Sequence, residues 1–82
     1  MSESEVLDTV EEYVNLHQPS AYHLNVVRQG VRHDGDWWYV VVKPSQADIR
    51  ARDYSDIMEQ IEDQIRADHH LKVLLVPTQP GD

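Results

Sequence analysis

The chain of 82 residues contains no cysteine, which excludes a disulfide framework and any metal site built from thiolates. Its three glycines, Gly30, Gly35 and Gly81, fit neither a phosphate-binding loop nor a dinucleotide-binding turn. The H-E-x-x-H pattern and an H-x-E pattern with paired cysteines are also missing. A chain without cysteine suits a reducing compartment, so we expect a cytoplasmic protein that needs no cofactor and no metal ion.

Long apolar runs and basic residues are scarce as well. The longest apolar run extends from Trp37 to Val42, whereas a membrane-spanning helix needs about 20 apolar residues. Residues 1–17 hold five acidic residues and no lysine or arginine, the reverse of the basic start of a signal peptide. Seven basic against fifteen acidic residues give a net charge of −8 at pH 7. This acidity opposes binding to anionic membranes and to nucleic acid, so we expect no membrane partner and consider nucleic acid the weaker alternative.

Hydrophobic periodicity predicts an α+β fold with the element order αββαβ. The predicted elements are helices over residues 3–17 and 52–67 and strands over residues 22–32, 37–43 and 71–77. Ser2 and Glu5 form an S-x-x-E capping pattern at the start of the first helix. Asp53 is the predicted N-cap of the second helix, whose apolar stripe faces the core.

The three strands are predicted to form one sheet with both helices packed on one face. The strand at 37–43 is apolar on both faces, which favours the central position, with 71–77 parallel to it through a right-handed crossover. The alternative places the strand at 22–32 in the middle, antiparallel to both neighbours. We expect the whole chain to be a single domain, ordered over about residues 3–77, with a loose tail at 78–82.

The segment HDGD predicts a tight hairpin turn between the first two strands. Asp34 and Gly35 as the two loop residues fit a type I′ turn, which needs positive φ at both central positions. This register places Arg32 opposite Trp37, where the two form a cation–π pair. A slip of one residue would exchange the two faces of the strands, and a bulge near Gly30 would shift part of the first strand.

The adjacent residues Trp37 and Trp38 must point to opposite faces of their strand. In this register the core face of the hairpin carries Val27, Gln29, Val31, Trp38, Val40 and Val42. Trp37 lies on the open face, away from the helices. The predicted open-face residues are Val26, Arg28, Arg32, Trp37, Tyr39, Val41, Lys43, Leu74 and Val76. Such a patch can exceed the few hundred Å² of contiguous apolar surface that a monomer usually shows, so we expect a second copy or another protein to cover it.

This open face supports three hypotheses about function. The first is a non-catalytic protein-interaction module that self-associates as a homodimer, and on this hypothesis the protein is not an enzyme. The second is a single-stranded nucleic-acid binder, in which Trp37 and Tyr39 stack on bases while Arg28, Arg32 and Lys43 contact phosphates. The element order resembles part of the type II KH arrangement, but the G-x-x-G loop of that module is missing.

The third hypothesis is a small enzyme or ligand-binding subunit, and the sequence offers little chemistry for it. His69 and His70 are adjacent, so on a regular element they point in different directions and cannot chelate one ion unaided. The carboxylate pairs Glu11-Glu12 and Glu62-Asp63 lie on solvated helical faces, without an apolar pocket that would raise a pKa for acid–base catalysis.

The segment WWYVVVKP, followed by a polar connection and the helix DYSDIMEQIEDQI, resembles small uncharacterised bacterial proteins with a W-W-Y-V-x-V-x-P strand. The resemblance covers about residues 33–76. It implies a self-contained domain and assigns no functional residues.

Overall fold

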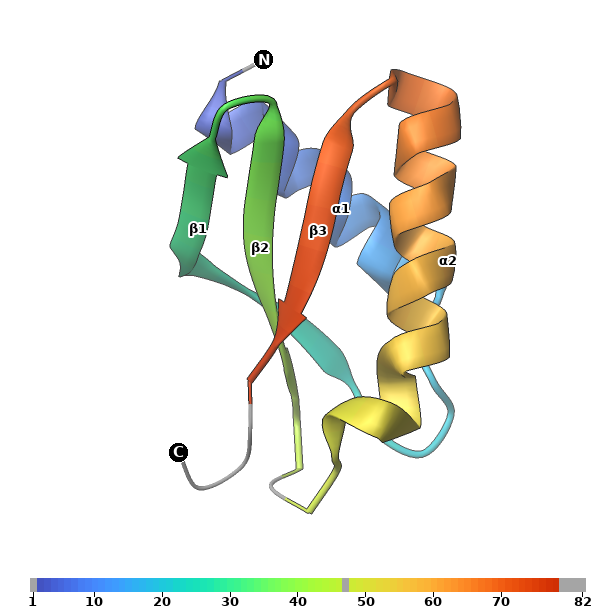
Figure 1. Ribbon diagram of the computed structural model, residues 1–82. Coiled ribbons are helices and arrows are strands. Elements are labelled where there is room, and N and C mark those ends of the chain that lie inside the picture. Colours follow the sequence, from blue (N-terminus) through green and yellow to red (C-terminus); the bar gives the residue numbers. More distant parts are fainter. Residues whose placement is uncertain (1, 47, 79–82) are drawn as a thin grey trace.

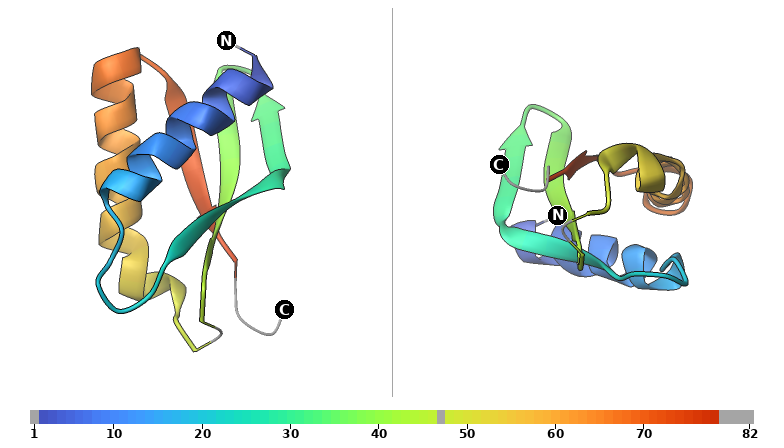
Figure 2. Two further views of the ribbon diagram at one scale, coloured as in Figure 1. Left: turned by 180° about the vertical axis from the view of Figure 1, so that it is seen from behind. Right: turned by 90° about the horizontal axis from the view of Figure 1, so that it is seen from below.

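The structure is a computed structural model that describes residues 2–46 and 48–78. Its elements are α1 (Glu3–Leu16), β1 (Leu24–Asp34), β2 (Trp37–Pro44), α2 (Ala51–His69) and β3 (Lys72–Pro77). Figure 1 shows the three strands with α1 crossing behind them and α2 alongside β3 at the edge of the sheet, and Figure 2 shows the same arrangement from behind and from below. The predicted α+β class and element order are confirmed.

The central strand of the sheet is β2, in the order β1-β2-β3. It pairs antiparallel with β1 and parallel with β3, and α2 forms the connection between β2 and β3 (Figure 1). This is the topology that the apolar character of β2 on both faces favours. The alternative with β1 in the middle is wrong, because β1 pairs with β2 alone.

The helix ends show which local sequence signals the fold uses. The Ser2 hydroxyl accepts a hydrogen bond from the Glu5 N–H at 3.3 Å, as the capping pattern predicts. The N-cap of α2 is Arg50 and not Asp53, which instead occupies the third helical position. The Asp53 carboxylate accepts from the Arg50 N–H at 2.9 Å, so it still satisfies a donor of the first turn. His70 ends α2 in the left-handed conformation, with φ of 52°.

The hydrophobic core lies between the sheet and the helices. Its buried side chains are Val6, Leu7, Val10, Tyr13, Val14, Leu24, Trp38, Val40, Val42, Tyr54, Met58, Ile61, Ile65, Val73 and Leu75. Trp38 is 8% exposed and Trp37 is 37% exposed, so the predicted division of the two tryptophans is confirmed. The Tyr13 hydroxyl donates to the Asp68 carboxylate at 2.6 Å, which joins α1 to α2 and raises the pKa of Tyr13 to about 12.

The hairpin turn differs from the predicted one. Its two loop residues are Gly35 and Asp36, because Asp34 is still paired with Trp37 in the sheet. Gly35 has φ of 60°, and neither aspartate of the turn has positive φ. Only the first central position is therefore left-handed, which is the pattern of a type II′ turn. The predicted type I′ turn is wrong because it would have forced Asp34 into a conformation that glycine adopts at much lower cost.

A bulge over residues 28–31 interrupts β1, where four residues of β1 lie opposite Val40 alone. Figure 1 shows the sharp bend of β1 on its way to the hairpin. Four residues against one leave three extra, and alternate residues of a strand face opposite sides. Because three is an odd number, the alternation of β1 side chains falls out of step across the bulge. A position that simple alternation would place on the open face lies on the core face, and the reverse.

The bulge overturns the predicted positions of Val26 and Arg28. Val26 lies opposite the buried Val42 and packs against the core, on the side of the helices. The guanidinium of Arg28 reaches α1, where it forms ion pairs with Asp8 at 3.2 Å and with Glu11. Both residues are therefore absent from the open face, because the register before the bulge is shifted by one residue from the predicted one.

Thr78 is the one residue of the predicted tail that the structure describes, and residues 79–82 lie outside the described part. The Thr78 N–H donates to the carbonyl of Val42 at 3.2 Å. The chain therefore remains attached to β2 for one residue beyond the end of β3.

Gly30 lies within the bulge, where its backbone comes close to Val41. A Cβ atom there would lie 2.7 Å from Cγ2 and 3.2 Å from Cβ of Val41, a β-branched side chain that rotates little. We expect Gly30→Ala to lower the free energy of unfolding by about 1–3 kcal/mol through overpacking, as measured by urea denaturation. Val41→Ala removes the colliding methyl groups and should abolish most of this loss. An equal loss in both backgrounds would contradict the steric explanation.

Candidate interaction surface on the open sheet face

The register of the sheet arranges the open-face side chains in four rows. From the hairpin downward, the rows are Asp34–Trp37–Lys72, Arg32–Tyr39–Leu74, Val27–Val41–Val76 and Asn25–Lys43. We call the apolar members of these rows the open-face patch: Val27, Trp37, Tyr39, Val41, Leu74 and Val76. Trp37 and Leu74 are 37% and 41% exposed, and the other four are half-buried. Neighbouring rows lie within reach of large side chains, so the apolar residues of β2 and β3 form one strip, and Val27 of β1 adjoins it opposite Val41.

Most of the residues predicted for this face lie on it. Those in place are Arg32, Trp37, Tyr39, Val41, Lys43, Leu74 and Val76. Val27, predicted for the core, takes the place of Val26, and Arg28 lies on the helix side. The predicted cation–π pair of Arg32 with Trp37 is also wrong, because Arg32 lies opposite Tyr39. The role of this face in an interaction stays a prediction.

A shallow hollow of about 460 Å³ adjoins the patch where β1 bends away from β2. It is lined by Gln29, Gly30, Val31, Arg32, Tyr39, Val41 and Val76. Three of these residues, Tyr39, Val41 and Val76, belong to the open-face patch. The open-face patch is therefore not flat, because this hollow indents it.

Charged side chains lie at the two ends of the patch. At the hairpin end, Asp34 stands beside Trp37, and Asp36 lies in the turn. The Lys72 ammonium is 4.0 Å from the Asp36 carboxylate. At the opposite end Lys43 is exposed, between the buried residues Val42 and Pro44. Arg32 lies in the second row, next to the hairpin end. Among the described residues, the open-face charges without an ion-pair partner are thus Asp34 at one end, Lys43 at the other and Arg32 between them.

Each outer edge of the sheet is capped by a side chain. The amide of Gln18 accepts from the Leu24 N–H at 2.7 Å and donates to the Leu24 carbonyl at 2.8 Å. On the other edge, the Glu62 carboxylate accepts from the Leu75 N–H at 2.7 Å. Burial raises the pKa of Glu62, although this hydrogen bond acts in the opposite direction. These side chains occupy backbone groups that an added strand would need, so the edges are less suited to a partner than the open face.

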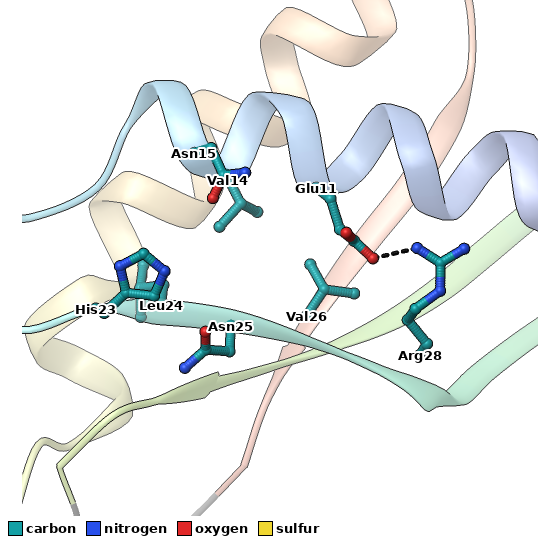
Figure 3. Close-up of a pocket in the computed structure, with 8 residues that line it drawn as sticks. All are labelled: Glu11, Val14, Asn15, His23, Leu24, Asn25, Val26 and Arg28. Carbon is teal, nitrogen blue, oxygen red and sulfur yellow. Dashed lines mark hydrogen bonds and ion pairs between the residues drawn. The ribbon is translucent and has the colours of Figure 1, made fainter.

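A second hollow, of about 300 Å³, lies between α1 and β1 (Figure 3). It is lined by Glu11, Val14, Asn15, His23, Leu24, Asn25, Val26 and Arg28. Figure 3 shows the Glu11 carboxylate pointing at the Arg28 guanidinium. This contact, with a smaller contribution from Asp8, raises the pKa of Arg28. The positive charge of Arg28 in this hollow is therefore already neutralised by carboxylates of α1.

Within residues 2–46 and 48–78, no group of three histidine or acidic side chains is placed to hold a metal ion.

The position of Arg28 weakens the nucleic-acid hypothesis. The predicted stacking platform combines two aromatic rings with Arg28, Arg32 and Lys43. Arg28 instead lies on the opposite face and is neutralised by α1. Asp34 adds a carboxylate beside Trp37, where a phosphate backbone would have to approach. The platform keeps two of its three basic residues and gains an acidic one.

Comparison of the chain with protein-family models, with curated proteins and with solved structures gives no match. The resemblance to bacterial proteins with a W-W-Y-V-x-V-x-P strand therefore stays a prediction. Among the described residues, neither helix combines the length and the apolar character that crossing a membrane requires.

Proposed function

We propose that this protein is a non-catalytic interaction module that self-associates through the open-face patch. The observation that supports the proposal is an apolar patch on the face of the sheet opposite α1 and the hydrophobic core, with Trp37 and Leu74 well exposed. A continuous apolar surface is a common mark of a protein-binding site, whereas single exposed apolar residues are not. The simplest partner is a second copy, because a two-fold axis brings the same patch of both copies together.

The open-face patch has the size of a small, transient interface. Three strands are about 14 Å wide and the four rows are about 20 Å long. This footprint is small beside the roughly 800 Å² that each partner contributes to a standard interface. We therefore propose a weak, reversible homodimer with a dissociation constant on the order of 1–100 μM.

Substitution of Trp37 by aspartate tests the proposal. The parent should sediment increasingly as a dimer as its concentration is raised from about 5 to 500 μM. Trp37→Asp should remain a monomer over this range and melt within a few degrees of the parent. The reason is that an unpaired carboxylate is costly in an apolar interface but tolerated on an exposed strand.

Leu16 provides the matched control, since it is 70% exposed on α1, on the other side of the molecule. Leu16→Asp removes an exposed apolar side chain of similar character and should dimerise like the parent. A parent that stays monomeric at about 500 μM, well above the proposed dissociation constant, would refute the proposal, and so would a dimer that Leu16→Asp abolishes equally.

A further inference from the structure

We propose that the two copies pack face to face with their β2 strands antiparallel, so that Lys43 of one protomer lies over Trp37 and Asp34 of its partner. This inference rests on the proposed self-association and adds the orientation of the dimer. It predicts which charged side chains meet across the interface.

The opposite charges of the open face stand at opposite ends of the patch. Along β2, Trp37 and Lys43 mark the two ends of the open face, about 20 Å apart. Asp34 lies beside Trp37 in the first row, and Lys43 lies in the last row. Within the described residues neither Asp34 nor Lys43 forms an ion pair, whereas Arg28, Arg66 and Lys72 do so. Arg32 is also exposed and without an ion pair among the described residues, but it lies in the second row and meets an apolar side chain of the partner in either orientation. Asp34 and Lys43 are therefore the unpaired charges that distinguish the two orientations.

A two-fold axis in the plane of the interface can run along β2 or across it. An axis along β2 makes each row meet the same row of the partner, so Lys43 faces Lys43 at the axis. An axis across β2 reverses the order of the rows, so the Lys43 row meets the Asp34–Trp37 row. Like charges placed opposite each other oppose association, whereas opposite charges favour it and fix the register. The charges therefore favour the axis across β2.

The antiparallel arrangement also suits the apolar middle of the patch. The row of Tyr39 and Leu74 then lies over the partner's row of Val41 and Val76, so aromatic and aliphatic side chains alternate across the interface. The Lys43 ammonium comes over the indole of Trp37, whose face attracts a cation. Among charged side chains, the parallel arrangement offers one favourable kind of contact, Lys72 with the partner's Asp34. Lys72 is already 4.0 Å from Asp36 of its own chain, so a further contact with the partner's Asp34 would stabilise the dimer less.

Charge reversal tests the orientation in the full chain. Lys43→Glu and Asp34→Lys should each raise the dimer dissociation constant about tenfold, because two-fold symmetry makes each contact occur twice. The double variant Lys43→Glu/Asp34→Lys should restore it to within about threefold of the parent. Sedimentation equilibrium at low salt measures all three, and thermal melting verifies that each variant is folded. Added salt should reduce the effect of the single reversals.

Lys72→Glu tests the competing, parallel arrangement of the two copies. In the parallel arrangement it would weaken the dimer, and Lys72→Glu/Asp34→Lys would restore it. Rescue in that pair and not in the Lys43 pair would overturn the antiparallel orientation. If Trp37→Asp yields a monomer but no charge reversal changes the affinity, self-association stands and the proposed orientation fails. If the parent is already a monomer, both fail together.

Discussion

Replacement of Trp38 by alanine should remove about 3–5 kcal/mol from the free energy of unfolding. Trp38 is 8% exposed on the central strand, and its indole stacks in parallel on the imidazole of His33 with ring centroids 3.8 Å apart. A domain of this size has a total stability of only about 4–12 kcal/mol, so the variant should be marginally folded or unfolded at 25 °C. Circular dichroism during urea titration measures the loss.

Two matched variants show whether the loss comes from the core position. Trp37→Ala removes the same side chain one residue earlier, from the open face, and should cost less than about 1 kcal/mol at concentrations where the protein is monomeric. Trp38→Phe keeps an aromatic ring and should fall between Trp38→Ala and the parent. A Trp38→Ala variant that melts within a few degrees of the parent would mean that the wrong face of β2 has been assigned to the core.

The class of fold and the central position of β2 were predictable because they depend on local apolar patterns. The strand from Trp37 to Pro44 is apolar on both faces, a pattern that favours a central strand, and here it is covered on one face and carries a patch on the other. The apolar stripe of α2 and the capping residue Ser2 similarly determine the two helices from neighbouring residues. Asp53 shows the limit of such signals, because an acidic residue serves equally well at the N-cap and at the third position.

The face of β1 was not predictable from its own sequence. Val26 and Val27 are adjacent, so either can enter the core without changing the apolar pattern. The choice is made by contacts between elements: Val26 lies opposite Val42, and Arg28 finds two acidic partners on α1. Gly30 is the one local sign of the bulge, and it gives neither the number of extra residues nor their faces.

The candidate interaction surface was predicted well where it depends on β2 and β3. Alternation along these regular strands places Trp37, Tyr39, Leu74 and Val76 on one face whatever the register of β1. The errors are confined to β1: Val26 and Val27 exchange faces before the bulge, and Arg28 lies within the bulge, whose register sequence periodicity does not determine. The absence of Arg28 has the largest consequence for the functional hypotheses. It removes a basic residue that would contact phosphates, and so favours a protein partner over a nucleic acid.

Replacement of Tyr54 by alanine should be as damaging as the change at Trp38, at about 3–5 kcal/mol. Tyr54 is fully buried on α2, and its ring meets that of Tyr22 edge-on with centroids 6.5 Å apart. Its hydroxyl donates to the carbonyl of Thr78 at 3.5 Å, a long hydrogen bond. Loss of this side chain should loosen α2 and with it β3, which supplies Leu74 and Val76 to the open-face patch. Urea denaturation of Tyr54→Ala measures the cost.

Tyr54→Phe separates the ring from its hydroxyl. Because the hydrogen bond is long, this variant should lose less than about 1 kcal/mol at neutral pH. Burial raises the pKa of Tyr54, so the folded state resists ionisation that the unfolded chain accepts near pH 10. The stability that the un-ionised hydroxyl contributes is complete below about pH 10 and is lost as the pH rises through the higher folded pKa. The parent should therefore lose stability relative to Tyr54→Phe as the pH is raised above 10. An advantage of the parent that grows over this range would contradict the buried position of the hydroxyl.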